Sequence, residues 1–367
     1  MAEVSRRQVL ALSAGALAAG GWAADVTLDG LARAKGLRFG TAVAHGSAGD
    51  AAYRALIARE CGIIVPENEL KLYAIRPTAE GMAFAEADRL AAFAKANGQL
   101  FRGHTLLWNR DKFAPKWLLD QGLGDKPERW LADYVRAVAG RYAGQVQSWD
   151  VVNESIDPAT GGLCDSVFTR AMGADAVEIA FHAAREADPK ARLAYNDYMG
   201  WGAGDAKHRA GVLKLLERLK SRNVPIDAFG IQSHIGNGDA GNVVTISAAD
   251  EREWRRFLDE ARGLGLDFLL TEFDVNDTVL PADPARRDAD CAAIARAYLD
   301  IMLDYRETKQ LLAWGLADNH TWLQTWWPRP DRLAKRPTPY DADLKPKPLR
   351  EAVAAALRGA PERTPWA

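Results

Sequence analysis

Short apolar runs alternate with longer amphipathic segments along nearly all of the chain after residue 37. Eight of these runs have the length and the β-branched content of buried strands. They cover residues 37–43, 62–66, 100–107, 146–152, 192–196, 228–232, 267–272 and 311–316. Helical segments lie at residues 51–59, 85–97, 127–142, 174–187, 206–221, 249–264, 287–305 and 349–357. Eight strands alternating with eight helices predict a single α/β domain, a closed (β/α)8 TIM barrel with enlarged βα loops.

One helical segment shows the expected pattern most clearly. Between residues 250 and 262, apolar side chains recur at the spacing that places them on one face of a helix, namely Trp254, Phe257, Leu258 and Ala261. Ser247 precedes this segment and is a suitable N-cap residue. We therefore expect a helix that begins after Ser247 and packs this face against the barrel.

The first 24 residues have the composition of an export signal. Ser5, Arg6 and Arg7 precede an uncharged run of Ala, Leu and Gly at residues 9–24, a pattern that resembles a twin-arginine signal. We expect this leader to be removed and the protein to be periplasmic or extracellular, and the alternative is an uncleaved membrane anchor. No linker or composition shift divides residues 25–367, so they are predicted to form one (β/α)8 domain.

Charge and composition exclude several classes of partner. The chain has 47 Lys and Arg against 49 Asp and Glu, a formal charge of −2. No basic excess indicates nucleic acid, or a membrane surface after export. The three cysteines are too few and too scattered for a disulfide framework or a Cys-based zinc site, and the six histidines lack metal-ligand spacing. We expect a monomer that needs no metal or cofactor and binds a neutral partner.

Polar residues cluster where the predicted strands end. Barrel enzymes build their active sites from these C-terminal ends and the loops that follow them. Taken singly, each such residue has an ordinary structural explanation, such as capping a turn. Barrel closure brings them to one rim, where the cost of desolvation favours mutual hydrogen bonding or a bound substrate. The strand ends concerned lie at residues 66–71, 103–108, 149–154, 195–198, 232–234, 271–274 and 314–318.

Two carboxylates stand out among these strand ends. Glu154 follows the fourth predicted strand and Glu272 ends the seventh. A pair of this kind suits cleavage of a glycosidic bond, in which one carboxylic acid protonates the leaving oxygen and the other group attacks the anomeric carbon. The separation of the pair, about 5–5.5 Å in retaining enzymes, decides the stereochemistry.

The strand-end motifs together resemble glycoside hydrolase family ten, the retaining endo-β-1,4-xylanases. The resemblance covers residues 37–357 and rests on Pro-Glu-Asn-Glu-Leu-Lys at 66–71, Arg-Gly-His-Thr-Leu-Leu-Trp at 102–108, Trp-Asp-Val-Val-Asn-Glu at 149–154, Tyr-Asn-Asp-Tyr at 195–198, Gln-Ser-His at 232–234 and Thr-Glu-Phe-Asp-Val at 271–275. It implies that Glu154 is the general acid/base and Glu272 the nucleophile. The implied substrate is xylan and its oligosaccharides.

The resemblance also assigns binding positions. It places Glu67, Asn68 and Lys71 on the non-reducing side of the cleavage point. It places further side chains around the sugar under attack, namely His104, Trp108, Asn153 and Gln232. Aromatic rings cover the apolar faces of sugars, a role that suits Trp314 and Trp322, with Tyr198 nearer the leaving side.

His234 and Asp274 are expected to support the nucleophile. Asp274 lies two residues after Glu272, so in an extended strand both side chains face the same side. The family links these three groups. A network from Asp274 through His234 would orient Glu272 and keep it ionised, while Glu154 stays protonated near neutral pH. The alternative is a strand-end hydrogen bond with a structural role only.

The chain departs from the family pattern at a few positions, which bear on the shape of the sugar subsites. Leu72 and Tyr73 replace the usual Trp-Asp, Asn109 stands where His is usual, and Thr321 replaces Ser. The carboxylates alone also fit a retaining β-1,4-glucanase or mannanase, and a non-catalytic oligosaccharide-binding barrel is a further alternative. Residues 236–241 match G-x-G-x-x-G, but no helix follows them directly, so a loop at the cleft rim is expected.

Overall fold

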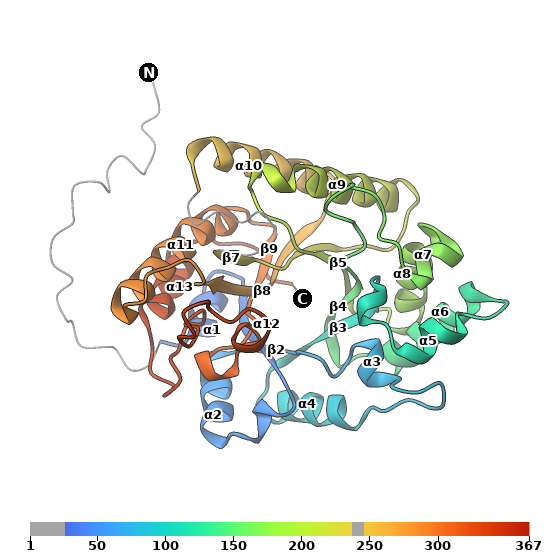
Figure 1. The fold of residues 1–367 in the computed structure, drawn as a ribbon, viewed down its shortest axis with the longest axis horizontal. Helices are drawn as coiled ribbons and strands as arrows, with labels where there is room; N and C mark the ends of the chain where they lie inside the picture. The colour runs from blue at the N-terminus through green and yellow to red at the C-terminus, as the bar shows by residue number, and fades with distance from the viewer. Residues whose placement is uncertain (1–25, 237–245, 367) are drawn as a thin grey trace.

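The computed structural model describes residues 26–236 and 246–366, and in this part of the chain eight parallel strands close into a barrel (Figure 1). The ring runs β1, β2, β3, β4, β5, β6, β8, β9 and back to β1. The predicted (β/α)8 fold is therefore confirmed. The strands of the ring are β1 (Arg38–Val43), β2 (Ile63–Pro66), β3 (Leu100–Trp108), β4 (Val146–Asn153), β5 (Arg192–Asp197), β6 (Ala228–Ile231), β8 (Asp267–Asn276) and β9 (Thr308–Ala313). A ninth short strand, β7 (His234–Gly236), follows β6 and also pairs with β8.

Helices surround the strands, as Figure 1 shows. Each predicted helix is present, as α2 (Ala51–Glu60), α4 (Ala85–Ala96), α6 (Pro127–Arg141), α8 (Asp175–Ala187), α9 (Ala206–Ser221), α10 (Ala248–Gly263), α11 (Pro284–Asp304) and α13 (Pro348–Gly359). Shorter helices that the sequence did not predict are α1 (Leu28–Arg33), α3 (Leu72–Ile75), α5 (Lys116–Gln121), α7 (Val167–Met172) and α12 (Leu323–Trp326). All but α1 lie in loops that follow the C-terminal ends of strands, so these loops are enlarged, as expected.

Helix α10 shows why the sequence folds in this way. The Ser247 hydroxyl accepts a hydrogen bond from the Asp250 backbone N–H at 3.1 Å, and the Asp250 carboxylate accepts one from the Ser247 backbone N–H. This reciprocal capping box fixes the predicted start of the helix. The four predicted apolar side chains are all buried. Full burial of a side chain such as Phe257 or Leu258 contributes about 1.5–3 kcal/mol.

The strands become irregular near their C-terminal ends. β6 and β7 form one path along β8, interrupted at Gln232 and Ser233, and Ser233 has a φ of 67°. β4 and β5 shift register between Asp150 and Val152, and Glu154, just after β4, has a φ of 54°. Such irregularities turn side chains away from the regular alternation of a strand and are common beside active sites.

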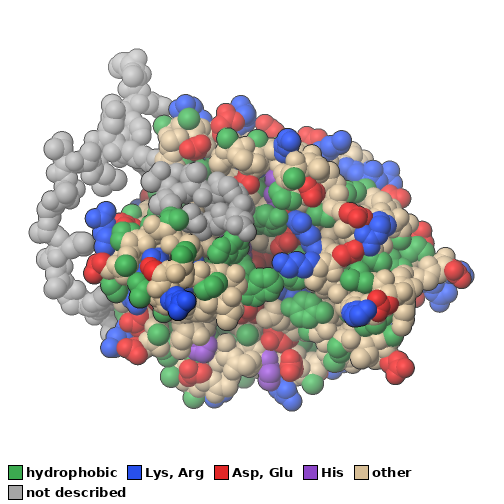
Figure 2. All heavy atoms as spheres, in the orientation of Figure 1, with side chains coloured by type: hydrophobic (Ala, Val, Ile, Leu, Met, Phe, Trp, Pro, Cys, Tyr) green, Lys and Arg blue, Asp and Glu red, His purple; other side chains and the backbone are tan. Residues whose placement is uncertain are grey.

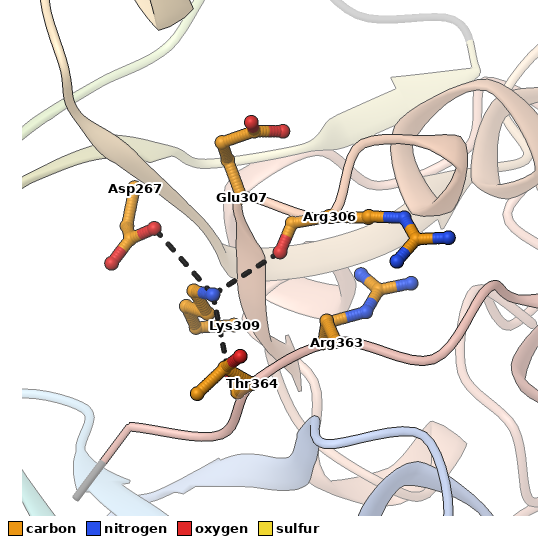
Figure 3. Close-up of a pocket in the computed structure, with 6 residues that line it drawn as sticks. All are labelled: Asp267, Arg306, Glu307, Lys309, Arg363 and Thr364. Carbon is orange, nitrogen blue, oxygen red and sulfur yellow. Dashed lines mark hydrogen bonds and ion pairs between the residues drawn. The ribbon is translucent and has the colours of Figure 1, made fainter.

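The C-terminal segment packs against the opposite end of the barrel. Lys309, near the start of β9, donates hydrogen bonds to the backbone oxygens of Arg306 and Thr364 and pairs with Asp267 at 3.7 Å (Figure 3). Arg363 donates to the backbone oxygens of residues 303, 305 and 308. These contacts surround a hollow of about 230 Å³, and its polar groups serve mainly to hold the chain end in place.

The predicted export leader lies outside the described residues, and so does most of the glycine-rich loop, of which only Gly236, at the end of β7, is described. In the described part of the chain, no helix has the length and apolar character needed to span a membrane. Cys61, Cys164 and Cys291 are buried and unpaired, so the cysteines form no disulfide.

Candidate active site

The polar strand ends meet at one mouth of the barrel, as parallel strands require. Adjacent strands place functional side chains in register, because Asn153 lies opposite Asn196, and His234 opposite Asp274. Figure 2 shows hydrophobic side chains gathered near the middle of the viewed face, with acidic and basic side chains between them. The mixture of rings, amides and charges suits a neutral, hydroxyl-rich ligand.

Glu272 lies at the end of a buried network of charged side chains. The Nε2 atom of His234 is 3.3 Å from the Glu272 carboxylate, and its Nδ1 atom is 3.0 Å from the Asp274 carboxylate. Burial alone would lower the pKa of His234, but the charge of Asp274 and hydrogen bonds to both carboxylates raise it to about 10. A protonated imidazole can donate to both carboxylates at once.

The same network of charged side chains sets the charge of Glu272. Burial alone would raise the pKa of Glu272, but the hydrogen bond with His234, together with neighbouring His104 and Lys71, outweighs burial and lowers it to about 2. Glu272 is therefore ionised at any ordinary pH. An ionised carboxylate held in one orientation has the properties that a nucleophile needs.

Neutral amides connect the two carboxylates. The Asn196 side-chain amide donates to Glu272 and to Asn153 Oδ1, both at 2.8 Å. Gln232 donates to Asn153 Oδ1 at 3.3 Å and to Glu154 at 2.9 Å. Thr271 donates to Asn196 Oδ1, which fixes the amide orientation. These neutral amides hydrogen-bond to both carboxylates and add no charge between them.

Glu154 has a different environment. Burial raises the pKa of its carboxyl group, the negative charge of Asp197 adds to this increase, and the Gln232 hydrogen bond and Arg110 oppose it. Arg110 Nε lies 3.7 Å from the carboxylate. A carboxyl group with a raised pKa can donate a proton and later accept one, as an acid/base catalyst must.

A charged cluster follows β2. Lys71 Nζ donates to Asn68 Oδ1 at 3.3 Å, and Asn68 donates to Glu67 at 3.4 Å. Burial lowers the pKa of Lys71 and raises that of Glu67, while the attraction between their charges opposes both changes. These side chains offer donors and acceptors of the kind that sugar hydroxyls need.

Aromatic rings line the same region. Lys71 Nζ lies 4.6 Å from the centre of the Trp108 ring and 5.9 Å from that of Trp314. Trp322 donates through Nε1 to Asp274 at 2.8 Å, with its ring centre 5.0 Å from that of His234. Tyr198 lies apart from this group, and its hydroxyl accepts a hydrogen bond from Arg110 at 3.2 Å.

The orientation of His104 is fixed by a buried carboxylate. Its Nδ1 atom lies 2.9 Å from the Asp150 carboxylate, which also accepts two hydrogen bonds from Arg102. All three side chains are buried. With Nδ1 engaged, the ring orientation is fixed and its edge lies near Trp314, at a ring-centre distance of 5.3 Å.

The departures from the family pattern have clear structural positions. Leu72 is buried in the core, and the Tyr73 hydroxyl donates to Asn68 Oδ1 at 2.7 Å, so Tyr73 supports the cluster after β2. Asn109 is fully buried and accepts a hydrogen bond from Ser166, the N-cap residue of α7. Thr321 is buried and caps the backbone N–H of Leu323.

The structure places the site residues named from the sequence at this mouth of the barrel, and Tyr198 contacts Arg110, which pairs with Glu154. Two residues near the carboxylates were missed. Asn196 belonged to a quoted motif, and its position opposite Asn153 in paired strands was the signal for its role. Arg110 lies in a loop, where no periodicity indicates direction, and only its proximity in the folded chain reveals it.

The arrangement suits acid/base and nucleophilic chemistry on a neutral ligand. One carboxylate is held ionised and the other is biased towards its protonated form. Among the described residues, no group of three or more His, Cys, Asp or Glu side chains is placed to hold a metal ion.

Comparisons with known proteins agree with this geometry. The family described as Glycosyl hydrolase family 10 matches residues 27–356. Endo-1,4-beta-xylanase 3 of Hypocrea jecorina is 31% identical over 336 residues, which cover 91% of this chain and 87% of that protein.

Solved structures give the same result. Native xylanase 10B from Thermotoga maritima superposes with a TM-score of 0.80 at 29% identity, covering 90% of this chain and 98% of that one. Xylanase 10B from Thermotoga petrophila, in complex with xylobiose, also gives 0.80, at 28% identity over 92% and 98% of the two chains. The chain described here therefore belongs to glycosyl hydrolase family 10.

Proposed function

We propose that the protein is an endo-1,4-β-xylanase that hydrolyses internal β-1,4 bonds of xylan with retention of configuration. The observation that carries this proposal is the contrast between the two carboxylates, one with its pKa lowered to about 2 and the other with its pKa raised. Family membership and the named activity of similar proteins support the choice of xylan.

The reaction would proceed in two displacements. Glu272 attacks the anomeric carbon while Glu154 gives its proton to the leaving oxygen, which forms a covalent glycosyl-enzyme. Glu154, now ionised, takes a proton from water, and the resulting nucleophile releases the sugar from Glu272. The lowered pKa of Glu272 also makes it a good leaving group in this second step.

The remaining side chains are proposed to hold the sugar chain. Glu67, Asn68 and Lys71 would bind the non-reducing side, and Trp314 and Trp322 would cover apolar sugar faces. Tyr198, with Arg110, would contact the leaving side. Around the sugar under attack we place His104, Trp108, Asn153 and Gln232.

Export and the monomeric state are further proposals. The paired Arg6 and Arg7 followed by an uncharged run support export, and a polymeric substrate outside the cell is consistent with it. A monomer fits a site in which every proposed group comes from one chain. N-terminal sequencing of the exported protein tests removal of the leader, and gel filtration tests the monomeric state.

Substrate choice is tested by incubating the purified protein with xylan, cellulose and mannan and separating the released oligosaccharides by length. We expect xylo-oligosaccharides, and a proton NMR spectrum taken early in the reaction should show the β-anomer first. Cleavage of cellulose or mannan without cleavage of xylan would overturn the substrate, and an initial α-anomer would overturn retention.

A further inference from the structure

Two loops that are far apart in sequence meet across the barrel mouth. One follows β3 and contains Lys112 and Phe113, and the other follows β9 and contains Trp326. The strand order β9, β1, β2, β3 places the ends of β1 and β2 between them. The ends of β1 and β2 therefore lie on the shorter path around the barrel between the two loops. In Figure 1, α12, which carries Trp326, lies close to the barrel opening.

The contact consists of side chains. The ring centres of Phe113 and Trp326 are 6.4 Å apart. Lys112 Nζ lies 5.1 Å from the centre of the Trp326 ring and 5.4 Å from that of Phe113, so one cation faces both rings. We call Lys112, Phe113 and Trp326 the aromatic bridge.

The aromatic bridge is joined to the sugar-binding region on both sides. Phe113 stacks on Trp108 with ring centres 3.6 Å apart, and the ring centre of Trp326 is 6.4 Å from that of Trp322. Lys71, which follows β2, lies near both Trp108 and Trp314. The aromatic bridge therefore connects Trp108 on one side with Trp322 on the other, close to the cluster after β2 to which Lys71 belongs.

The exposure of Trp326 indicates that the bridge is not required for folding. Its side chain is 58% exposed, more than any other large hydrophobic residue in the described part of the chain. A tryptophan that is mostly exposed to solvent contributes little to the core. Lys112 is also exposed and Phe113 is half-buried, so the bridge lies at the surface and outside the core of the barrel.

We propose that the aromatic bridge limits the length of sugar chain accepted on the non-reducing side of the cleavage point, so that short xylo-oligosaccharides are cleaved with a higher kcat/KM than the internal bonds of polymeric xylan. This inference rests on the proposed xylanase function. A chain bound internally would have to pass the bridge on its way out of the cleft, whereas a short end fits inside it. Cleavage of internal bonds then depends on opening of the bridge.

The test compares the wild-type protein with the double variant Phe113→Ala/Trp326→Ala. Two substrates are used, xylotetraose and a soluble linear xylan, and kcat/KM is measured for each. The loss of viscosity per reducing end released gives the randomness of attack on the polymer. We expect the double variant to raise the polymer-to-tetraose ratio of kcat/KM at least threefold and to lower viscosity faster per bond cleaved.

Two controls separate this effect from general damage. Trp326→Phe retains a ring and should behave like the wild-type protein, and Leu119→Ala removes another exposed apolar side chain, on α5, and should leave the ratio unchanged. An unchanged ratio in a folded, active double variant would overturn the role of the bridge. A wild-type protein inactive on both substrates would instead overturn the proposed function.

Discussion

Glu272 and Glu154 lie in the same cleft, yet the protein treats the two carboxylates in opposite ways. Glu272 is held by a charged chain through His234 to Asp274, and its pKa is lowered to about 2. Glu154 is held mainly by neutral amides, and burial raises its pKa. The difference teaches that burial acts on both groups alike, while the charge of the neighbouring side chains decides the role of each.

Removal of the nucleophile should have the largest effect. Glu272→Ala leaves no group to form the covalent intermediate, so kcat on xylan should fall by roughly 10⁴- to 10⁶-fold, the range seen when a catalytic nucleophile or its partners are deleted. Steady-state assays of released reducing ends check this prediction. Glu217→Ala, which removes an exposed carboxylate on α9, is the matched control and should retain full activity.

Removal of the acid should have a smaller and substrate-dependent effect. Glu154→Ala should lower kcat on xylan by about 10²- to 10⁴-fold, the usual contribution of general acid–base catalysis. Formation of the glycosyl-enzyme from a dinitrophenyl xylobioside needs no proton, so its rate should change little. Pre-steady-state release of dinitrophenol measures it. An equal loss on both substrates would contradict the assignment.

The contact of Asp274 with His234, which hydrogen-bonds to Glu272, predicts a third effect. Asp274→Asn removes the charge that raises the pKa of His234, so His234 supports the ionised nucleophile less well. The pKa of Glu272 then rises. Activity requires ionised Glu272, so as the pH is lowered the variant should lose activity at a higher pH than the wild-type protein does. A hydrogen bond to a charged group contributes about 1.5–3 kcal/mol, so kcat/KM should fall about 10- to 150-fold.

Trp322→Phe is the matched comparison for this prediction, because it removes the other hydrogen bond to Asp274 and leaves His234 in place. Its kcat/KM can fall through loss of sugar contact, but the acid limb of its pH profile should stay where it is in the wild-type protein. If the acid limb moved equally in both variants, Asp274 would act through Trp322 rather than through His234.

The smallest effect is expected at Arg110. Its charge lowers the pKa of Glu154, which must be protonated for the first step, so activity is lost as pH rises through that pKa. Arg110→Met should therefore raise the pKa of Glu154 and move the alkaline limb to higher pH. Partly exposed ion pairs contribute about 0.2–1 kcal/mol, which limits the shift to about 0.7 pH unit. Arg129→Met, an exposed arginine on α6, should cause no shift.

The sequence predicted those features of the site that regular strands and helices position. The periodicity of the strands gave the barrel, and the two-residue spacing of Glu272 and Asp274 placed both on one side of β8. Ser247 marked the start of α10 through a local hydrogen-bond pattern. These features depend on residues close together in the sequence, through the period of a strand or a local capping pattern.

The part that could not be predicted lies in loops and strand irregularities. Arg110 reaches Glu154, and Phe113 reaches Trp326, because enlarged loops fold over the barrel mouth, and loop residues follow no fixed period. The break between β6 and β7 at Ser233 also follows no pattern in the sequence, because it depends on pairing with β8. The sequence also left the effect of Asn109 open, and only the folded chain shows that it is buried and accepts a hydrogen bond from Ser166 at the start of α7.

The most direct test of the contrast between the two carboxylates is azide rescue of Glu272→Ala and Glu154→Ala, with the configuration of the glycosyl azide determined by NMR. Azide should replace the missing nucleophile in the first variant and give an α-azide from the β-linked substrate. In the second variant it should attack the glycosyl-enzyme and give a β-azide. The reverse pair of products, or a Glu272→Ala protein that is active without azide, would contradict the account.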